Sequence, residues 1–288
     1  MALAELFADA SPETFLREQY LKLPFARAGG CRHLMSLASW DRVGQILQQP
    51  GADVVAGRAG EQWAGKLPAS LDEARAVLAA GYMLGIRHSE RHDAGLAALA
   101  AGFQADFLAP IDIHLFCTPA DHPGYGWHYD AEEVFMLQLA GRKEWWLRKN
   151  TVNPWPLMET LPADMRYDRE IMPVMRCTLQ AGDWLYVPAG YWHRTQSGEE
   201  SISLSVGVQA ATAMNAFDFL RTELLDSLRW RQRLPPAGAA TALTATELQA
   251  AYETLFAELG RDLQRILARP ETAAAYLAAR RKPRANSG

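Results

Sequence analysis

The sequence predicts a mainly β fold with flanking helices, followed by a helical subdomain. From about residue 111, short runs with β-strand character alternate with Gly and Pro, which is typical of strands joined by tight turns. After residue 213 the strand pattern stops, and apolar residues recur at helical spacing instead. We therefore expect a first domain over residues 1–212 and a helical subdomain over residues 213–288.

The first hundred residues are expected to form helices and short connections. The clearest signal is Ser70-Leu71-Asp72-Glu73, a capping box at the start of an alanine-rich segment. In such a box the side chains of the first and fourth residues each accept the other residue's backbone N–H, which favours helix initiation at this point.

The middle of the chain is expected to be all-β. Gln138 to Lys143 has the composition of a hairpin turn that joins two of the strands. In the last strand, Ser201, Ser203 and Ser205 alternate with apolar residues, so the three serines should share one face. The predicted strands are Ile111–Thr118, Val134–Leu139, Lys143–Leu147, Asp183–Val187 and Ser201–Val208.

The C-terminal segment is expected to contain amphipathic helices. Apolar residues recur at helical spacing from Phe217 to Leu228, until Pro235-Pro236 ends the run. Thr244-Ala245-Thr246-Glu247 is a second capping box, and the helix that it opens carries a broad apolar stripe. A stripe of this width must be buried, either against the first domain or against a second copy of the chain.

Composition limits the class of protein. The net charge of -4 and the pI near 6.0 give no electrostatic footprint for a polyanion, so direct nucleic-acid binding is not favoured. The 3 cysteines are far apart and form no CxxC pair, which favours a reducing compartment. We find no run of apolar residues long enough to cross a membrane and no basic segment before an apolar start. These features predict a cytoplasmic protein.

Two motifs carry potential metal chemistry. His128-Tyr129-Asp130 places a histidine and a carboxylate two residues apart, and on an extended chain such side chains point the same way. A distant His193 can complete a set of two imidazoles and one carboxylate, which suits ferrous iron with its other coordination positions open. The HxD triplet alone is a weak signal, since a loop histidine beside a surface aspartate has the same pattern.

The surrounding residues make the signal specific. The run HYDAEEVFMLQLAGRKEW over residues 128–145 and the distal VPAGYWH over residues 187–193 resemble JmjC-type ribosomal oxygenases of the cupin superfamily. The N-terminal FLREQYLKLPF over residues 15–25 is similar to a helix of that family, and the resemblance covers about residues 10–210. It implies a double-stranded β-helix (the cupin or jelly-roll fold), Fe(II), 2-oxoglutarate as co-substrate, O2, and hydroxylation of a protein side chain. The helical subdomain resembles the dimerisation region of these enzymes, which implies a homodimer.

The resemblance also assigns residues. It implies that His128, Asp130 and His193 bind the iron and that Lys143 pairs with the far carboxylate of 2-oxoglutarate, with Arg142 as its rival. Ser205 matches a hydroxyl position that could contact the same carboxylate. For Ser203, packing and a contact are equally supported.

The chain also departs from the family pattern. His114 and Phe116 stand where asparagine and tyrosine are common, so a tyrosine hydroxyl contact is missing. His114 could serve the cofactor or substrate, or it could be a buried histidine satisfied by the backbone. The family's terminal winged-helix module has no room after the helical segment, which leaves the substrate open.

Other polar and aromatic residues have two readings each. Glu132 and Glu133 could attract a basic substrate group, although an exposed acidic turn is slightly preferred. His88 and His92 are better explained as a solvated helix end than as a zinc site. The flanking aromatic residues could line a substrate groove or pack as core: Tyr125, Trp127, Tyr191 and Trp192.

The sequence therefore predicts an iron(II)- and 2-oxoglutarate-dependent dioxygenase that hydroxylates an aliphatic side chain of a protein or peptide, with a ribosomal protein as one candidate. A small molecule or a biosynthetic peptide is an alternative substrate, and demethylation is an alternative outcome. Outside this class, a metal-binding cupin without oxidative chemistry would need no Lys143. A cupin isomerase or hydrolase would show an additional acid or base pair, which we do not find clearly in the sequence.

Overall fold

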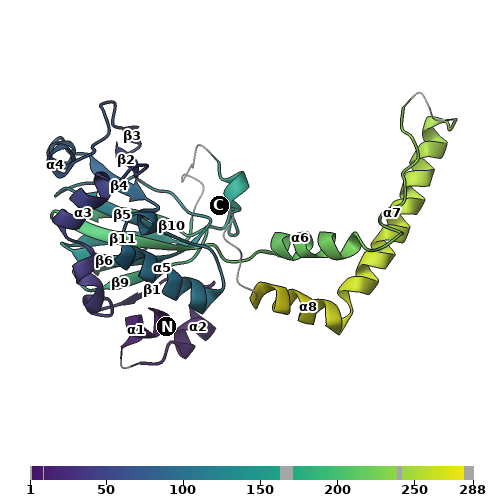
Figure 1. Cartoon of the computed structure of the whole chain (residues 1–288), viewed down its shortest axis with the longest axis horizontal. Coiled ribbons are helices and arrows are strands. Elements are labelled where there is room, and N and C mark those ends of the chain that lie inside the picture. Colours follow the sequence, from purple (N-terminus) through teal and green to yellow (C-terminus); the bar gives the residue numbers. More distant parts are fainter. Residues whose placement is uncertain (1, 9, 163–170, 239–241, 282–288) are drawn as a thin grey trace. The chain divides into compact units, whose positions relative to one another are not determined.

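The structure is a computed structural model that describes residues 2–8, 10–162, 171–238 and 242–281. It consists of two compact units, Met1–Ala210 and Ala211–Gly288, which are described separately (Figure 1). Among the described residues, no helix is both long enough and apolar enough to span a bilayer.

The first unit is built on two antiparallel sheets. The larger has the strand order β1-β9-β6-β11-β5-β4-β2-β3, and the smaller has the order β10-β7-β8. The larger sheet contains β1 (Phe25–Arg27), β2 (Asp53–Arg58), β3 (Glu61–Gln62), β4 (Met83–Arg87), β5 (Ile111–Thr118), β6 (Glu133–Ala140), β9 (Trp184–Val187) and β11 (Ser201–Val208). The smaller contains β7 (Lys143–Arg148), β8 (Met175–Leu179) and β10 (Trp192–Ser197). The predicted double-stranded β-helix with flanking helices is confirmed.

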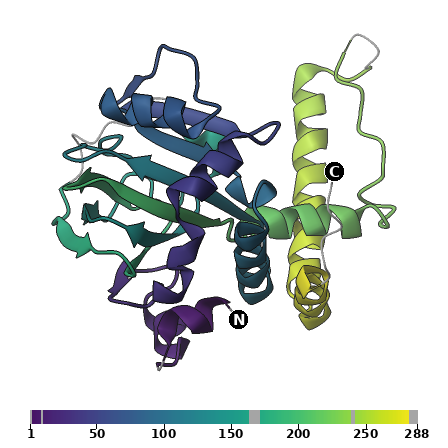
Figure 2. The same ribbon diagram turned by 60° about the vertical axis from the view of Figure 1, so that its left-hand side comes forward.

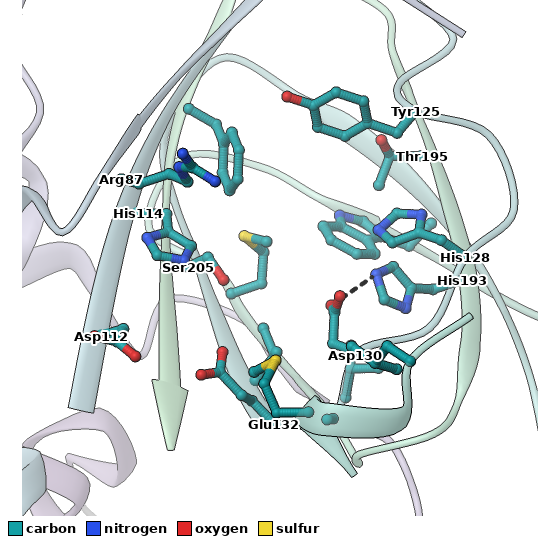
Figure 3. A pocket seen from close by; sticks show the side chains of 18 of the residues that line it. Arg87, Asp112, His114, Tyr125, His128, Asp130, Glu132, His193, Thr195 and Ser205 are labelled. Carbon is teal, nitrogen blue, oxygen red and sulfur yellow. Dashed lines mark ion pairs between the residues drawn. The ribbon is translucent and has the colours of Figure 1, made fainter. Parts of the chain in front are cut away.

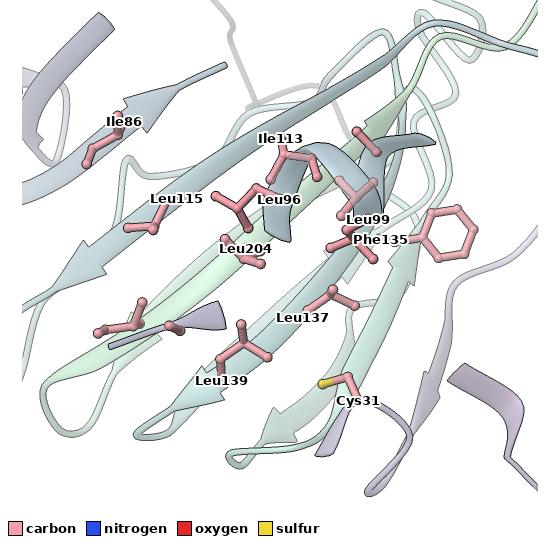
Figure 4. Packing of buried hydrophobic residues seen from close by; sticks show 14 of the residues in the cluster. Cys31, Ile86, Leu96, Leu99, Ile113, Leu115, Phe135, Leu137, Leu139 and Leu204 are labelled. Atoms are coloured by element: carbon pink, nitrogen blue, oxygen red, sulfur yellow. The ribbon is translucent and has the colours of Figure 1, made fainter. Parts of the chain in front are cut away.

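Helices cover the outer face of the larger sheet (Figure 2). Leu96 and Leu99 of helix α5 lie over Leu204 and Phe135 of the sheet, in one continuous apolar core (Figure 4). The helical elements of this unit are α1 (Ala2–Phe7), α2 (Glu13–Glu18), α3 (Trp40–Leu47), α4 (Leu71–Ala79) and α5 (Ala94–Phe107), with short 3-10 turns η1 (Arg32–Leu37), η2 (Ser89–Arg91) and η3 (Met158–Thr160). The predicted helix start is confirmed at α4, where the Ser70 side chain accepts the Glu73 N–H, but the Glu73 side chain accepts the N–H of Ala69 instead of Ser70, so the reciprocal box is not complete.

Alternation along β5 and β11 separates the core from the interior of the β-helix. Leu115 pairs with Leu204 and faces the helices, while the neighbouring His114 pairs with Ser205 and faces the other way. The prediction that the serines of β11 share one face is confirmed, because its apolar residues 202, 204, 206 and 208 all belong to the helix-covered core. Polar side chains are thereby directed between the two sheets.

The prediction of a purely helical start is wrong. Strands β1 to β4 precede residue 111, and β4 pairs directly with β5 in the larger sheet. These strands are short, and β2 and β4 contain Ala or Gly in place of regular polar alternation, so pairing with neighbouring strands, β4 with β5 and β2 with β4, decides their conformation. Strands β8 and β10 also escaped prediction.

The predicted hairpin at residues 138–143 is also wrong. Strand β6 pairs with β9 and β11, whereas β7 pairs with β8 and β10, so the segment crosses from one sheet to the other. Gly141 turns the chain there with φ of 70°. Turn-forming residues show that the chain reverses, but they carry no information on which strands become neighbours.

The second unit is helical, as predicted. It contains α6 (Ala213–Leu224), α7 (Ala245–Leu267) and α8 (Pro270–Arg281). The predicted capping box at Thr244 and Glu247 begins α7. Large apolar side chains on these helices stay exposed, including Phe256 (59 %) and Leu267 (54 %).

Candidate active site

Three predicted metal ligands come together between the two sheets. One donor atom from each of His128, Asp130 and His193 lies within 4.8 Å of the other two. A single antiparallel bridge fixes this arrangement, because the backbone N–H of each histidine donates to the carbonyl of the other, at 3.0 and 2.8 Å. The Gly190 N–H donates to the Asp130 carbonyl at 2.8 Å, which ties the segment before β6 to the turn before β10.

Both imidazole rings are oriented by the backbone. His128 Nδ1 lies 3.0 Å from the Gly126 carbonyl, and His193 Nδ1 lies 3.0 Å from the Tyr191 carbonyl. A carbonyl can only accept, so each Nδ1 carries the proton and each Nε2 keeps its lone pair. His193 Nε2 lies 3.5 Å from Asp130 Oδ2 (Figure 3). This tautomer and this convergence are what a metal site needs from its histidines.

The environment keeps His193 in its neutral form. Burial, and then the neighbouring His128, lower the pKa of His193 to about 4. The two ring centroids are 4.1 Å apart, so two imidazolium charges would repel strongly at this distance. Two imidazole nitrogens and one carboxylate oxygen are a donor set that suits divalent iron. These three donors would leave its other coordination positions open.

The three ligands form one side of a cavity of about 600 Å³ (Figure 3). Its interior is formed by β5, β6, β7, β10 and β11, and its lining combines charged, aromatic and apolar groups. The lining residues used below are Arg87, His88, Asp112, His114, Tyr125, Glu132, Lys143, Trp145, Met158, Leu161, Thr195, Ser205 and Gln209.

Lys143 is a buried cation within this cavity. Its side chain is 4 % exposed, and its ammonium donates to Ser203 Oγ at 3.1 Å. Burial lowers the pKa of Lys143 to about 8. Among the described residues, no carboxylate lies within ion-pair distance of this ammonium. Arg142, the rival from sequence, is exposed and does not line the cavity.

The other two predicted cofactor residues also line the cavity. Ser205 is 8 % exposed, but the hydroxyl that contacts Lys143 belongs to Ser203. His114 Nδ1 accepts the backbone N–H of His88 at 3.2 Å, which leaves its proton on Nε2. Burial, and then the nearby His88, lower the pKa of His114. His114 is therefore a backbone-satisfied histidine that also faces the cavity.

The preferred reading of Glu132 and Glu133 as an exposed turn is wrong. Glu132 lines the cavity, and burial, followed by Asp112 and Asp130, raises its pKa to about 7. Glu133 is 5 % exposed and accepts hydrogen bonds from the Tyr186 hydroxyl and the Ala189 N–H. Glu133 thus stabilises the fold at the start of β6, while Glu132 belongs to the site.

His88 and His92 flank the short 3-10 helix η2, as the helix-end prediction implies, but both are half-buried instead of fully solvated. His88 has a left-handed backbone (φ 51°), and its Nδ1 lies 2.9 Å from Asp112 Oδ1 on the cavity wall. Donor atoms of His88, Glu90 and Asp112 lie within 4.8 Å of one another. Asp112 already accepts a hydrogen bond from Gln209, and Glu90 accepts one from the Ile113 N–H. The charged group of His88, Glu90 and Asp112 thus lies across the cavity from the three ligands (Figure 3).

The aromatic residues divide between cavity and packing. Tyr125 lines the cavity and is 37 % exposed. Tyr191 and Trp192 are buried, and Trp192 packs edge-on against Tyr129. Trp145, which had no assigned role, lies beside the His193 ring at 5.9 Å.

Several cavity residues escaped the sequence reasoning. Thr195 follows His193 by two residues on β10, and Asp112 precedes His114 by two residues on β5. A period of two places them on the cavity face, so that signal was present in the sequence. Arg87 could not be found in this way, because its strand was not predicted.

Comparison with known proteins finds a known domain in the first unit. Residues 99–216 match the JmjC domain. The NO66 protein of Dictyostelium discoideum, called a bifunctional lysine-specific demethylase and histidyl-hydroxylase, is 36% identical over 114 residues, covering 38% of this chain and 21% of that protein. Human ribosomal oxygenase 1 is 33% identical over 108 residues, covering 37% of this chain and 17% of that protein. The chain thus matches less than a quarter of the length of these two relatives.

Solved structures show the same fold. The ribosomal oxygenase YcfD of Escherichia coli, solved with cobalt and 2-oxoglutarate, aligns with a TM-score of 0.57 at 20% identity, over 92% of this chain and 68% of that chain. The predicted resemblance is confirmed by the domain match and by these relatives. Residues 99–216 thus match a JmjC domain, and the chain is similar to the ribosomal oxygenases.

Proposed function

We propose that this protein is an iron(II)- and 2-oxoglutarate-dependent oxygenase that hydroxylates an aliphatic carbon in a side chain of a protein or peptide. Its relatives carry the names ribosomal oxygenase and histidyl-hydroxylase, which supports a protein substrate. YcfD, solved with cobalt and 2-oxoglutarate, supports the same cofactor class.

One observation carries the proposal: a three-donor metal site and a buried, carboxylate-free ammonium line the same cavity. A metal-binding cupin without oxidative chemistry needs the three donors but has no use for a buried charge that lacks a counter-ion. Burying an ammonium is costly, so its persistence indicates that an anion occupies the cavity during function. A dicarboxylic keto acid satisfies both features, since one end chelates a metal and the other carries a carboxylate.

Each residue then has a defined task. His128, Asp130 and His193 would hold the metal, with the ring orientations already set by the Gly126 and Tyr191 carbonyls. Lys143 would bind the far carboxylate, and Ser203 holds its ammonium in place. When bound, iron(II) with 2-oxoglutarate and O2 supplies the oxidant for the hydroxylation. Asp112 and Glu132, which also line the cavity, would orient the incoming side chain.

We further infer that the protein acts as a homodimer in the cytoplasm. The exposed apolar residues of the helical unit support association with a second copy, because such surfaces are normally covered in solution. The free thiols of Cys31, Cys117 and Cys177 support a reducing compartment.

The test of the proposed activity is succinate formation from 2-oxoglutarate in the presence of iron(II) and oxygen. We expect succinate from the wild-type protein, and we expect stimulation by ribosomal protein. The Asp130→Ala variant should form none, because two imidazoles alone bind the metal weakly. Wild-type protein that neither binds nor consumes 2-oxoglutarate would refute the proposal.

A further inference from the structure

The connection after β7 presents large apolar side chains to solvent. Val152 is 65 % exposed, Trp155 is 87 % exposed, and Met158 is 54 % exposed. We call residues 152–158 the apolar lip. A tryptophan that is almost fully exposed is unusual, since this side chain normally contributes a large buried area.

Hydrogen bonds to Asn150 hold the backbone at the start of the apolar lip. Asn150 is 1 % exposed, and its Oδ1 accepts the backbone N–H groups of Val152 and Asn153 at 3.0 and 2.9 Å. The Asn153 side chain donates to the hydroxyl of Tyr129, the residue between the metal ligands His128 and Asp130, at 3.4 Å. The position of the lip is thus coupled to the ligand segment.

The prolines on either side of Trp155 pack against the neighbouring turn. A Cβ added at Gly190, which has φ of 79°, would lie 2.8 Å from the Pro154 carbonyl oxygen and 2.9 Å from Pro156 Cδ. The two prolines therefore pack directly against the turn that precedes β10 and His193. Because proline fixes its own φ and restricts the residue before it, the Pro-Trp-Pro sequence limits the backbone conformations open to Trp155.

The far end of the lip enters the site. Met158 and the following Leu161 both line the metal cavity. The apolar lip thus extends from the solvent-exposed Trp155 to a residue, Met158, that lines the cavity. When a side chain of a polypeptide enters the cavity, the residues next to it in that polypeptide pass over the apolar lip.

We propose that the apolar lip is the docking surface for a polypeptide substrate, with Trp155 as its anchor against an apolar side chain near the target residue. This inference rests on the proposed function and specifies its substrate class. A small molecule of the size of the cavity would gain nothing from an indole outside it, whereas a polypeptide would bury that indole. Tryptophan is among the residues that most often dominate the affinity of protein interfaces.

The experiment uses the full chain, loaded with iron(II), and total ribosomal protein from cells that lack this protein as the probe. Hydroxylation is followed by mass spectrometry at several probe concentrations, which separates KM from kcat. Trp155→Ala is compared with Trp155→Phe and with Leu67→Ala, which removes another exposed apolar side chain (44 %) that does not line the cavity. Calorimetric titration with 2-oxoglutarate is carried out on every variant.

We expect Trp155→Ala to raise KM about tenfold, the change typical of losing an interface anchor, with kcat and 2-oxoglutarate affinity unchanged. Trp155→Phe should retain most of the wild-type affinity, and Leu67→Ala should match wild type. Equal KM values for Trp155→Ala and wild type would overturn the docking surface. So would wild-type protein that binds 2-oxoglutarate but modifies no polypeptide of the probe. Failure of the wild-type protein to bind 2-oxoglutarate would instead refute the proposed function.

Discussion

At the scale of single residues, Lys143 is the most informative side chain. It is buried beside the Ser203 hydroxyl, and burial lowers its pKa from 10.5 to about 8. A shift of this size means that the protonated ammonium destabilises the fold by about 3 kcal/mol at neutral pH. The fold therefore contains a costly charge, which a bound carboxylate would offset.

The Lys143→Met variant should separate the cost of the buried charge to stability from its contribution to 2-oxoglutarate binding. Removing the buried charge while keeping the volume should raise the free energy of unfolding at pH 7 by about 1 to 3 kcal/mol, measured by urea titration. The same variant should lose at least about tenfold in 2-oxoglutarate affinity, because the counter-charge is gone. A variant that is less stable and binds 2-oxoglutarate normally would contradict this role.

The pKa of Lys143 also predicts a pH dependence. Its lowered pKa means that the folded protein loses the ammonium proton as pH rises through about 8, and only the ammonium attracts a carboxylate. Affinity for 2-oxoglutarate should thus be highest below pH 8 and fall above it. The groups that interact with Lys143 electrostatically are Cys117, whose pKa burial raises to about 12, and His122, whose pKa burial lowers to about 4, so neither titrates in this range. Calorimetry at pH 7 and pH 9 measures the effect, and Lys143→Met should show none.

The sequence predicted the residues of the site better than their surroundings. His128, Asp130, His193 and Lys143 were found because they belong to two compact sequence motifs. The contact between Lys143 and Ser203 joins residues 60 positions apart, and the wall at Asp112 depends on strand pairing. Such contacts are decided by register between strands, which periodicity within one strand does not reveal.

At the scale of elements, the crossing between β6 and β7 positions Lys143. Gly141 has φ of 70°, and a Cβ there would overlap the Glu200 backbone oxygen and lie 2.8 Å from Ser201 Cβ. The chain thus passes from one sheet to the other with no space for a side chain. Lys143 follows two residues later, at the first position of β7.

Gly141→Ala should destabilise the protein more than Gly51→Ala. Gly51 also has a positive φ of 79° but has no atom within 4 Å of an added Cβ, so it reports the backbone cost alone. We expect about 1 kcal/mol for Gly51→Ala and at least about 2 kcal/mol for Gly141→Ala, measured by urea unfolding. Equal losses would show that the crossing has room to adjust.

The elements themselves were predicted unequally. Long strands with clear patterns, such as β5 and β11, were found with their bounds intact. Helices with N-cap signals, such as α4 and α7, were found because the signal is local. Strands β2 and β4 were missed, since Ala and Gly residues have low strand propensity and only tertiary pairing makes them extended.

At the scale of the whole molecule, the helical unit makes a testable claim about assembly. Sedimentation equilibrium should give about twice the chain mass of 31.9 kDa. Phe256→Glu places a charge on the exposed apolar surface of α7 and should shift the protein toward monomer. Thr254→Glu adds the same charge at an exposed position on the same helix and should leave the dimer intact. A wild-type monomer would refute the proposed dimer.

The most direct test of the central claim is the visible absorption of the iron-loaded protein under anaerobic conditions as 2-oxoglutarate is added. A 2-oxo acid chelated to ferrous iron gives a charge-transfer band, which neither component shows alone. We predict that the band appears with wild-type protein, is absent in Asp130→Ala, and requires higher 2-oxoglutarate concentrations in Lys143→Met. Iron-loaded wild-type protein without the band at saturating 2-oxoglutarate would contradict the claim that His128, Asp130, His193 and Lys143 form a single keto-acid site.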